Sequence, residues 1–229
     1  MNKFSSWQKF LSRFGLRKSK EKDIENNLIL KERNFVGKIL TNKEIEEAYR
    51  FRYKVFHEEL RWLPLNDEGK DIDKYDKYSV HFGIFHFEKL IAYSRIILPK
   101  GPFMLEEIFK DLIPNDYIFR KGKDSAEISR LAIDHQFRII SDSEIIKMLL
   151  FKIMYHWSLR NKIRFWYMCI DVGYLKSIQK LFPCKQIGEI KLYQSGTAST
   201  AALVDLREAE VLTKKGIQVF MIGLSEYES

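Results

Sequence analysis

Two helix-start signals enclose a run of strand-like segments, and this order limits the fold more than any other feature of the chain. Thr41 is followed by Glu44 and Ser141 by Glu144, the spacing of a capping box at a helix N-terminus. The first pattern predicts a helix over about 42–60, and the second predicts a helix of about 17 residues. Because strand patterns lie between the two helices, the chain is not expected to form a simple helix bundle.

The segments between and after these helices predict strands. Alternating and apolar stretches indicate strands over 79–87 and 89–98, joined by a tight turn at Glu88 and Lys89, and a third over 126–134. The other expected elements are strands at 165–170, 188–193 and 198–206, and helices at 103–112, 174–182 and 207–215. We expect an α/β fold with one mixed, twisted sheet and helices on both faces.

Composition places the chain among soluble globular proteins. Of 229 residues, 45% are hydrophobic and 31% charged, and no apolar run approaches the roughly 20 residues of a membrane span. Cys169 and Cys184 are the only cysteines, which excludes a disulfide scaffold and favours the reducing cytoplasm.

The net charge of +8 is concentrated near the N-terminus. Residues 1–22 hold seven basic side chains and one acidic one, so the remainder is nearly neutral and offers no extended basic face for nucleic acid. Five large apolar residues recur there at helical spacing: Phe4, Trp7, Phe10, Leu11 and Phe14. This pattern predicts an amphipathic helix over 4–14, which either packs on its own domain or makes peripheral contact with the inner membrane face. We therefore divide the chain into an arm and linker, 1–34, and a single domain, 35–229.

A loop crowded with acids follows the first predicted helix. Its acidic residues are Asp67, Glu68, Asp71, Asp73 and Asp76. A calcium loop is disfavoured because Gly69 stands where an EF-hand needs a carboxylate, so no metal site is expected. The simplest interpretation is a solvated acidic loop.

Charged residues also interrupt apolar strands. Arg95 lies among isoleucines, and a charge in such a strand needs a partner. Alternation places Glu127 on the strand face opposite Arg130, and a β-bulge would bring them together. These residues indicate either a structural ion pair, such as Arg95 with Asp73 or Glu127, or a site that binds a charged substrate and removes a proton.

An ordered set of eight residues resembles the LuxI-type acyl-homoserine-lactone synthase family. The matching positions are Arg52, Phe56, Trp62, Asp73, Asp76, Arg95, Glu127 and Arg130. The resemblance implies a GNAT-like acyltransferase fold, with a splayed strand pair formed by 126–134 and 165–170. It also implies transfer of a fatty acyl chain from acyl carrier protein to the amino group of S-adenosylmethionine. Lactonisation then yields an N-acyl-homoserine lactone, a quorum-sensing autoinducer.

The resemblance assigns roles to individual residues. Arg52, Phe56 and Trp62 would shape the S-adenosylmethionine pocket. Glu127 would act through water as the base that takes the proton from the amine, and Asp73 is the second expected catalytic residue. Asp73, Asp76 and Arg95 would hold the charged groups of S-adenosylmethionine and order the acidic loop. Ser129 would contact the acyl carbonyl region, Arg130 would pair with the acids, and Met168 would line an acyl pocket if its strand is not simply core. No tightly bound cofactor is implied.

Two departures keep alternatives open. Arg61 stands where the family usually has Gly, and the N-terminal arm is longer than is typical. One alternative is an N-acyl amino acid synthase, which takes a free amino acid in place of S-adenosylmethionine. Another is a non-catalytic, membrane-associated binding protein on the same fold.

The expected macromolecular partner, acyl carrier protein, is acidic. A basic cluster on and after the long helix consists of Lys147, Lys152, Arg160, Lys162 and Arg164. The cluster is either a docking face or a solvated helix surface.

Overall fold

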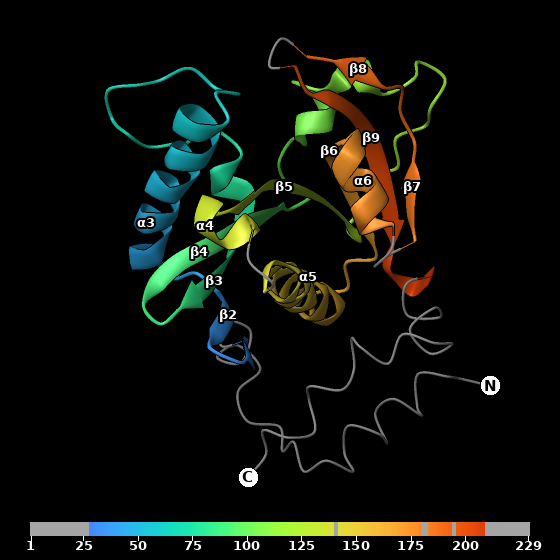
Figure 1. The fold of residues 1–229 in the computed structure, drawn as a ribbon. Coiled ribbons are helices and arrows are strands. Elements are labelled where there is room, and N and C mark those ends of the chain that lie inside the picture. The colour runs from blue at the N-terminus through green and yellow to red at the C-terminus, as the bar shows by residue number, and fades with distance from the viewer. Residues whose placement is uncertain (1–27, 140–141, 180–182, 194–195, 209–229) are drawn as a thin grey trace, which may run out of the picture.

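The computed structural model describes residues 28–139, 142–179, 183–193 and 196–208 (Figure 1). Nine described strands form one sheet in the order β1-β2-β3-β4-β5-β6-β9-β7, with β8 paired to β9. The strands are β1 (Ile29–Glu32), β2 (Phe35–Ile39), β3 (Ser79–His86), β4 (Lys89–Ile97), β5 (Ser125–Ile133), β6 (Phe165–Asp171), β7 (Cys184–Gln186), β8 (Lys191–Leu192) and β9 (Ala198–Asp205). The sheet is mixed, as predicted, because β5 and β6 are parallel and the other neighbours antiparallel.

The helical elements are α3 (Asn42–Tyr53), η1 (Lys54–Glu59), η2 (Asp76–Tyr78), η3 (Met104–Glu106), η4 (Lys110–Leu112), α4 (His135–Arg138), α5 (Ser143–Arg160) and α6 (Val172–Ile178). The long α5 lies against one sheet face, where Ile146, Leu150 and Met154 share a buried cluster with Phe82 and Ile84 of β3. The shorter α3 covers the other face. Helices therefore flank both faces, as the sequence predicts (Figure 1).

The first predicted helix is present but changes type part of the way along. Glu44 accepts a hydrogen bond from the Thr41 backbone N–H at 2.8 Å, so the first capping box is confirmed. After Tyr53 the chain continues as a six-residue π-helix, η1. A π-helix holds more residues per turn than an α-helix and is often found at functional sites. Here it carries Phe56 and His57.

Several expected elements differ in extent. The predicted helix over 103–112 is instead two 3₁₀ turns, η3 and η4, because the chain curves around Glu127, which binds the Met104 and Leu105 N–H groups. The short β7 is not predicted from the sequence. Strand β1 already belongs to the sheet, inside the segment expected as linker.

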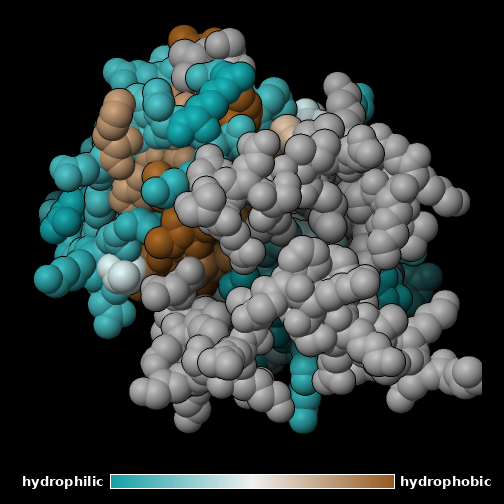
Figure 2. All heavy atoms as spheres, turned by 90° about the horizontal axis from the view of Figure 1, so that it is seen from below, coloured by the Kyte–Doolittle hydropathy of each residue, from teal (hydrophilic) through white to brown (hydrophobic). Residues whose placement is uncertain are grey.

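Some expectations lie outside the described residues. These are the amphipathic helix over 4–14, Ser141 of the second capping box, and the part of 207–215 beyond residue 208. The helix that Ser141 was expected to open is α5, whose N-cap is Asp142. None of the described helices is long and apolar enough to cross a membrane. Viewed from below, Figure 2 shows hydrophilic residues over most of the left side, with apolar residues gathered toward the centre and at the top.

The parallel strands β5 and β6 separate after a short paired stretch. They pair from Ser125 and Phe165 to Glu127 and Tyr167, and no further. Beyond this point the two strands diverge (Figure 1). The predicted splayed strand pair is therefore present, and Glu127 lies where the two strands part.

Candidate active site

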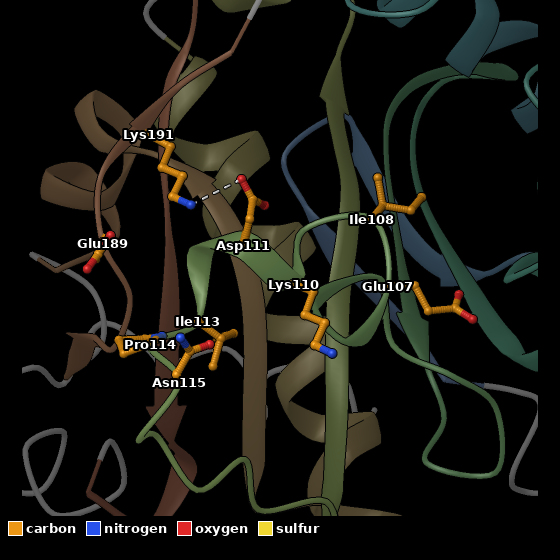
Figure 3. A pocket seen from close by; sticks show the side chains of 9 residues that line it. All are labelled: Glu107, Ile108, Lys110, Asp111, Ile113, Pro114, Asn115, Glu189 and Lys191. Atoms are coloured by element: carbon orange, nitrogen blue, oxygen red, sulfur yellow. Dashed lines mark ion pairs between the residues drawn. The ribbon is translucent and has the colours of Figure 1, made fainter.

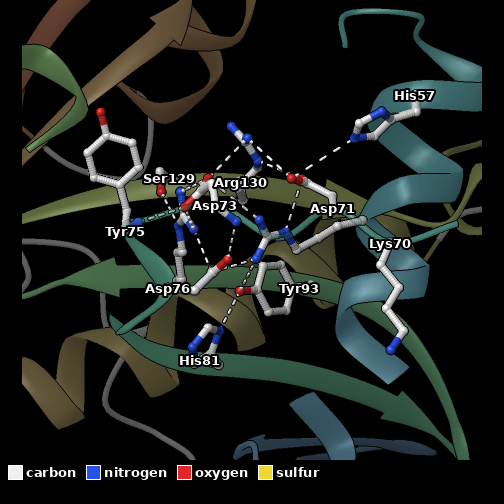
Figure 4. A network of polar contacts seen from close by, with 12 residues as sticks. His57, Lys70, Asp71, Asp73, Tyr75, Asp76, His81, Tyr93, Ser129 and Arg130 are labelled. Atoms are coloured by element: carbon white, nitrogen blue, oxygen red, sulfur yellow. Dashed lines mark hydrogen bonds and ion pairs between the residues drawn. The ribbon is translucent and has the colours of Figure 1, made fainter. Parts of the chain in front are cut away.

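Three guanidinium groups and three carboxylates form a buried network on the sheet (Figure 4). The arginines come from three elements: Arg52 from α3, Arg95 from β4 and Arg130 from β5. The carboxylates all come from the acidic loop and from η2 at its end: Asp71, Asp73 and Asp76. The loop predicted to be solvated thus turns three of its acids inward.

Arg52 lies at the centre of this network and is fully buried. Its Nε donates to Asp71 Oδ2 at 3.1 Å, and its Nη1 to Asp76 Oδ1 at 2.7 Å. Its Nη2 has no hydrogen-bond partner among the residues that the structure describes, and it lies 3.7 Å from Asp73 Oδ2. A guanidinium without access to water needs such partners, since an isolated buried charge is very costly.

Arg95 is also fully buried, and both of its terminal nitrogens bind Asp73. Nη1 and Nη2 donate to the two oxygens of Asp73 at 2.7 and 2.8 Å, and Nε donates to Ser129 Oγ at 2.8 Å. Bidentate geometry of this kind is strong and directional. The predicted pairing of Arg95 with Asp73 is confirmed, whereas Glu127 bonds to backbone groups instead.

A β-bulge brings Arg130 into the network. On β4 the residues Tyr93 and Arg95 pair with Ala132 and Ser129 of β5, which leaves one extra residue on β5. Arg130 has a φ of 57°, in the left-handed region. Its Nε donates to Asp71 Oδ2 at 2.8 Å and its Nη2 to Asp73 Oδ2 at 3.2 Å. The sequence pattern anticipated such a bulge, although its effect is to join Arg130 to the acids.

The arginines keep Asp71 and Asp73 ionised. Burial raises the pKa of Asp71, but Arg130 and Arg52 outweigh it and hold the pKa at about 2. Burial acts in the same direction on Asp73, and the bonds from Arg95 lower its pKa below the ordinary value. These two carboxylates are therefore negatively charged at neutral pH.

Glu127 lies apart from this network, beneath η3. It is 1% exposed and accepts hydrogen bonds from the backbone N–H groups of Met104 and of Leu105, the latter at 3.1 Å. Burial raises its pKa to about 8, and the two backbone bonds only partly oppose this. The Met104 sulfur, 3.5 Å from Arg95 Nη2, links the two sites. A carboxyl group with a pKa near 8 is suited to exchange a proton with an amine.

Two aromatic residues adjoin the network. The Phe56 ring is buried, and the Arg130 guanidinium lies 5.4 Å from its centroid. The Trp62 ring lies 6.0 Å from Phe56 and is 43% exposed. Arg61 has a φ of 52°, a conformation that favours Gly, which gives a physical reason for the Gly usual at this position in the family it resembles.

Met168 lies away from the network. It is buried in the core cluster under α5, whereas Glu127 bonds to η3 on the other sheet face. The neighbouring Cys169 belongs to the cluster on the Glu127 side, and burial, followed by the nearby Glu127, raises the pKa of its thiol to about 12. The structure thus groups Met168 with core residues.

Sequence reasoning missed three members of this site. Asp71 was noted only as one of the loop acids. The Tyr93 hydroxyl lies 3.5 Å from Arg52 Nη1 and 2.7 Å from His81 Nδ1. His81 on β3 pairs with Arg95 on β4, and Tyr93 is two residues from Arg95 along β4, so the two side chains are diagonal neighbours on adjacent strands. Burial lowers the pKa of His81 to about 4, so the ring is neutral. Polar residues inside two apolar strands were the signal that could have identified this pair.

A surface pocket of about 530 Å³ lies to the side of the network, between η4 and β8 (Figure 3). Glu107 lines it and also accepts a hydrogen bond from Tyr75 on the acidic loop at 2.6 Å. Lys191 and Asp111 pair across it at 3.4 Å. Its lining mixes both signs of charge and does not include the network arginines.

Comparisons with known proteins place this site in a family. The sequence model of the family described as N-acyl amino acid synthase FeeM matches residues 47–206. An acyl-homoserine-lactone synthase of Vibrio anguillarum is 26% identical over 166 residues, which cover 70% of this chain and 85% of the relative. One of Aliivibrio fischeri is 21% identical over 180 residues, covering 77% and 92%.

Solved structures show the same fold. The acyl-homoserine-lactone synthase LasI superposes with a TM-score of 0.68 at 22% identity, over 77% of this chain and 93% of that one. FeeM, an N-acyl amino acid synthase from uncultured soil microbes, gives 0.57 at 20% identity, over 79% and 96%.

The fold and the relatives define the class as GNAT-like acyltransferases that form N-acyl products. The chain belongs to the N-acyl amino acid synthase FeeM family. Its curated relatives show that acyl-homoserine-lactone synthases are close to this family, so the predicted resemblance is confirmed.

Proposed function

We propose that the chain transfers a fatty acyl group from acyl carrier protein to the amino group of S-adenosylmethionine and releases an N-acyl-homoserine lactone. The observation that carries this proposal is Trp62, a large aromatic side chain left 43% exposed beside Phe56 at the network. A sulfonium cation is favourably placed against such a ring.

Glu127 is the proposed proton acceptor. An ammonium group cannot attack a thioester, so it must first give a proton to the carboxylate. The amine nitrogen then forms a bond to the thioester carbon and the C–S bond breaks. The second proton lost by the nitrogen passes to the carrier sulfur, which leaves as the thiol. In the second step, the methionine carboxylate oxygen attacks the γ-carbon. The bond from that carbon to the sulfonium breaks, and methylthioadenosine leaves.

The basic cluster on and after α5 is the proposed docking face for acyl carrier protein. Two of its members are already paired, Lys147 with Glu144 at 2.5 Å and Arg164 with Asp205 at 2.6 Å. Lys152 and Arg160 lie one turn on either side of His156. Burial, and then the positive charges of these two residues, lower the pKa of His156 to about 4. Lys152 and Arg160 therefore form a positive strip on the helix that remains available to an acidic partner.

A free amino acid is the second candidate acceptor. The matching family model is described as an N-acyl amino acid synthase, and Arg61 adds a positive charge next to Trp62. That charge would repel a sulfonium and favour an acceptor without one.

Calorimetric titration with S-adenosylmethionine, and with free amino acids as controls, separates the two acceptors. Binding of S-adenosylmethionine that is lost in Trp62→Ala supports the lactone synthase. Binding of an amino acid alone, by a folded protein, contradicts it and supports the N-acyl amino acid synthase.

We further propose a cytoplasmic enzyme whose residues 4–14 contact the inner membrane face. The apolar residues of this segment alternate with Lys and Arg, as in helices that lie on anionic lipid. The full chain should sediment with phosphatidylglycerol vesicles, and Trp7→Glu with Phe10→Glu should abolish this. Equal sedimentation of both proteins would refute the contact.

A further inference from the structure

We propose that Lys121 is a positioning residue for Glu127 and that it acts through Glu106 and the η3 turn. The inference rests on the proposed function, because it takes Glu127 as the group that accepts the proton of the amine. Lys121 lies in the loop between η4 and β5, outside the arginine–carboxylate network.

Lys121 holds η3 and the residues just before it. Its Nζ donates to Glu106 Oε2 at 2.5 Å and to the Gly101 carbonyl oxygen at 2.7 Å. The same ammonium group lies 4.4 Å from the centroid of the Phe103 ring, a favourable cation–π contact. Gly101 is itself tightly packed, because a Cβ there would lie 2.2 Å from the Tyr78 ring. One lysine therefore ties the turn to a closely packed part of the chain.

Glu106 and Glu127 both cap the beginning of this turn. Glu106 Oε2 accepts a hydrogen bond from the Phe103 N–H at 2.7 Å. The next two N–H groups, of Met104 and Leu105, donate to the two carboxylate oxygens of Glu127. Three successive backbone donors are thus divided between two carboxylates. A change in the position of the turn therefore changes the hydrogen bonds of Glu127.

Several charged and titratable groups interact electrostatically with Glu127. They come from four elements: Arg95 on β4, Glu106 on η3, Tyr75 on the acidic loop and Cys169 on β6. Arg95 is held by the acids of the network. The Tyr75 hydroxyl donates to Glu107. Burial raises the pKa of the Cys169 thiol to about 12, so this group is neutral.

Glu106 is the remaining charged group, and Lys121 is its counter-ion. Burial raises the pKa of Glu127 to about 8, and the negative charge of Glu106 acts in the same direction. Lys121 opposes that charge at a point where the two side chains are only 22% and 33% exposed, so water screens the pair incompletely. Lys121 therefore favours the ionised form of Glu127, which is the form that accepts a proton.

Titration of the Glu127 carboxyl group in the purified protein tests the inference without any substrate. The readout is the pH dependence of its carbon NMR signal in protein labelled at the glutamate carboxyl carbon, identified by its absence from Glu127→Gln. Lys121→Met should raise the midpoint by about 0.5–1 pH unit, less than the shift caused by a charge in direct contact. Glu106→Gln keeps an oxygen acceptor for the Phe103 N–H and should lower the midpoint by a similar amount.

Three further variants separate the effect of charge from a loosening of the turn. Lys121→Met combined with Glu106→Gln removes both charges and should return the midpoint close to that of the wild type. Lys121→Arg keeps the positive charge and should keep the midpoint. The control is Lys123→Met, which removes an exposed lysine from the same loop and should leave the midpoint unchanged. If Lys121→Met does not fold, Glu106→Gln still tests the sign of the shift.

The same variants should change the rate of acyl transfer. A midpoint one unit higher leaves about tenfold less ionised Glu127 at pH 7. Lys121→Met should therefore lower kcat/KM for N-acyl product by up to that factor near neutral pH and recover at higher pH. A residue that only supported the fold would lower kcat/KM at every pH.

Two results would overturn the inference. One is an equal Glu127 midpoint in the wild type and in Lys121→Met. The other is a shift of the same sign in Lys121→Met and Glu106→Gln. Because the titration needs no substrate, either result leaves the proposed function intact. Absence of N-acyl product from the wild type with every acceptor would instead refute the proposed function and leave the titration unaffected.

Discussion

The buried network and the basic strip on α5, formed by Lys152 and Arg160, both contain positive side chains, yet the surroundings of these side chains differ completely. Arg52 and Arg95 are 0% exposed, and each is bound by two or more carboxylates. Arg160 is exposed, and Lys152 is half-buried on the same helix. The first pair cannot exist without partners, since a buried charge that loses its partner is strongly destabilising. The second pair can be changed at little structural cost.

This difference separates two kinds of function. The network fixes the geometry of the site, and its members depend on one another. The strip contributes long-range attraction for the acidic carrier protein. This attraction is the sum over several side chains and is screened by salt. Substitutions in the network and in the strip should therefore differ in both the kind and the size of their effect.

The largest effect is expected for Arg95→Met. It leaves Asp73 and Asp76 buried without their main partner and should lower the free energy of unfolding by about 3–5 kcal/mol. The matched change Arg160→Met should stay within about 0.5 kcal/mol. Urea unfolding of both variants measures this, and equal stabilities would show that the network is not held together by its charges.

Glu127→Gln should preserve the fold and lower acyl transfer by about 10²-fold or more, the scale of a general base. The side chain keeps an oxygen acceptor for one of the two backbone N–H groups. Turnover under saturating acyl carrier protein and acceptor is the readout. Near-normal turnover would assign Glu127 a structural role beneath η3.

The pH profile should carry the signature of the same residue. Because burial raises the pKa of Glu127 to about 8, the group is mostly protonated at pH 7 and cannot accept a proton. We expect kcat/KM to rise about tenfold per pH unit up to about pH 8 and then to level off. Glu127→Gln should lack this rise, and an unchanged profile in that variant would exclude Glu127 as its origin.

The smallest effect is expected on the strip. Reversing Lys152 and Arg160 to Glu should raise the KM for acyl carrier protein several-fold and leave the KM for the acceptor unchanged. The difference should shrink at high salt. Lys43→Glu on α3, exposed and remote from α5, is the control. An unchanged KM would remove this docking face.

The fold was largely predictable because its signals are local. Alternation in β3 and β4 and the apolar β6 are properties of short windows, and the Thr41 capping box fixes where α3 begins. The two 3₁₀ turns at 104–112 were not predictable, since their shape depends on Glu127 from a distant strand. The π-helix η1 likewise has no simple sequence pattern.

The site was predictable where a charge interrupts an apolar strand. Arg95 required a partner, and Asp73 was among those expected. Asp71 was missed because nothing in the acidic loop distinguishes acids that turn inward from those that stay solvated. The expected acyl-pocket role of Met168 remains a prediction, and the residue lies in the core on the face opposite Glu127.

The most direct test of the proposed function is a competition reaction. The purified protein is incubated with acyl carrier protein that bears a long fatty acyl chain, together with S-adenosylmethionine and the twenty amino acids. The products are identified by mass spectrometry. We expect N-acyl-homoserine lactone and methylthioadenosine in equal amounts. N-acyl amino acids without methylthioadenosine would contradict S-adenosylmethionine as the acceptor.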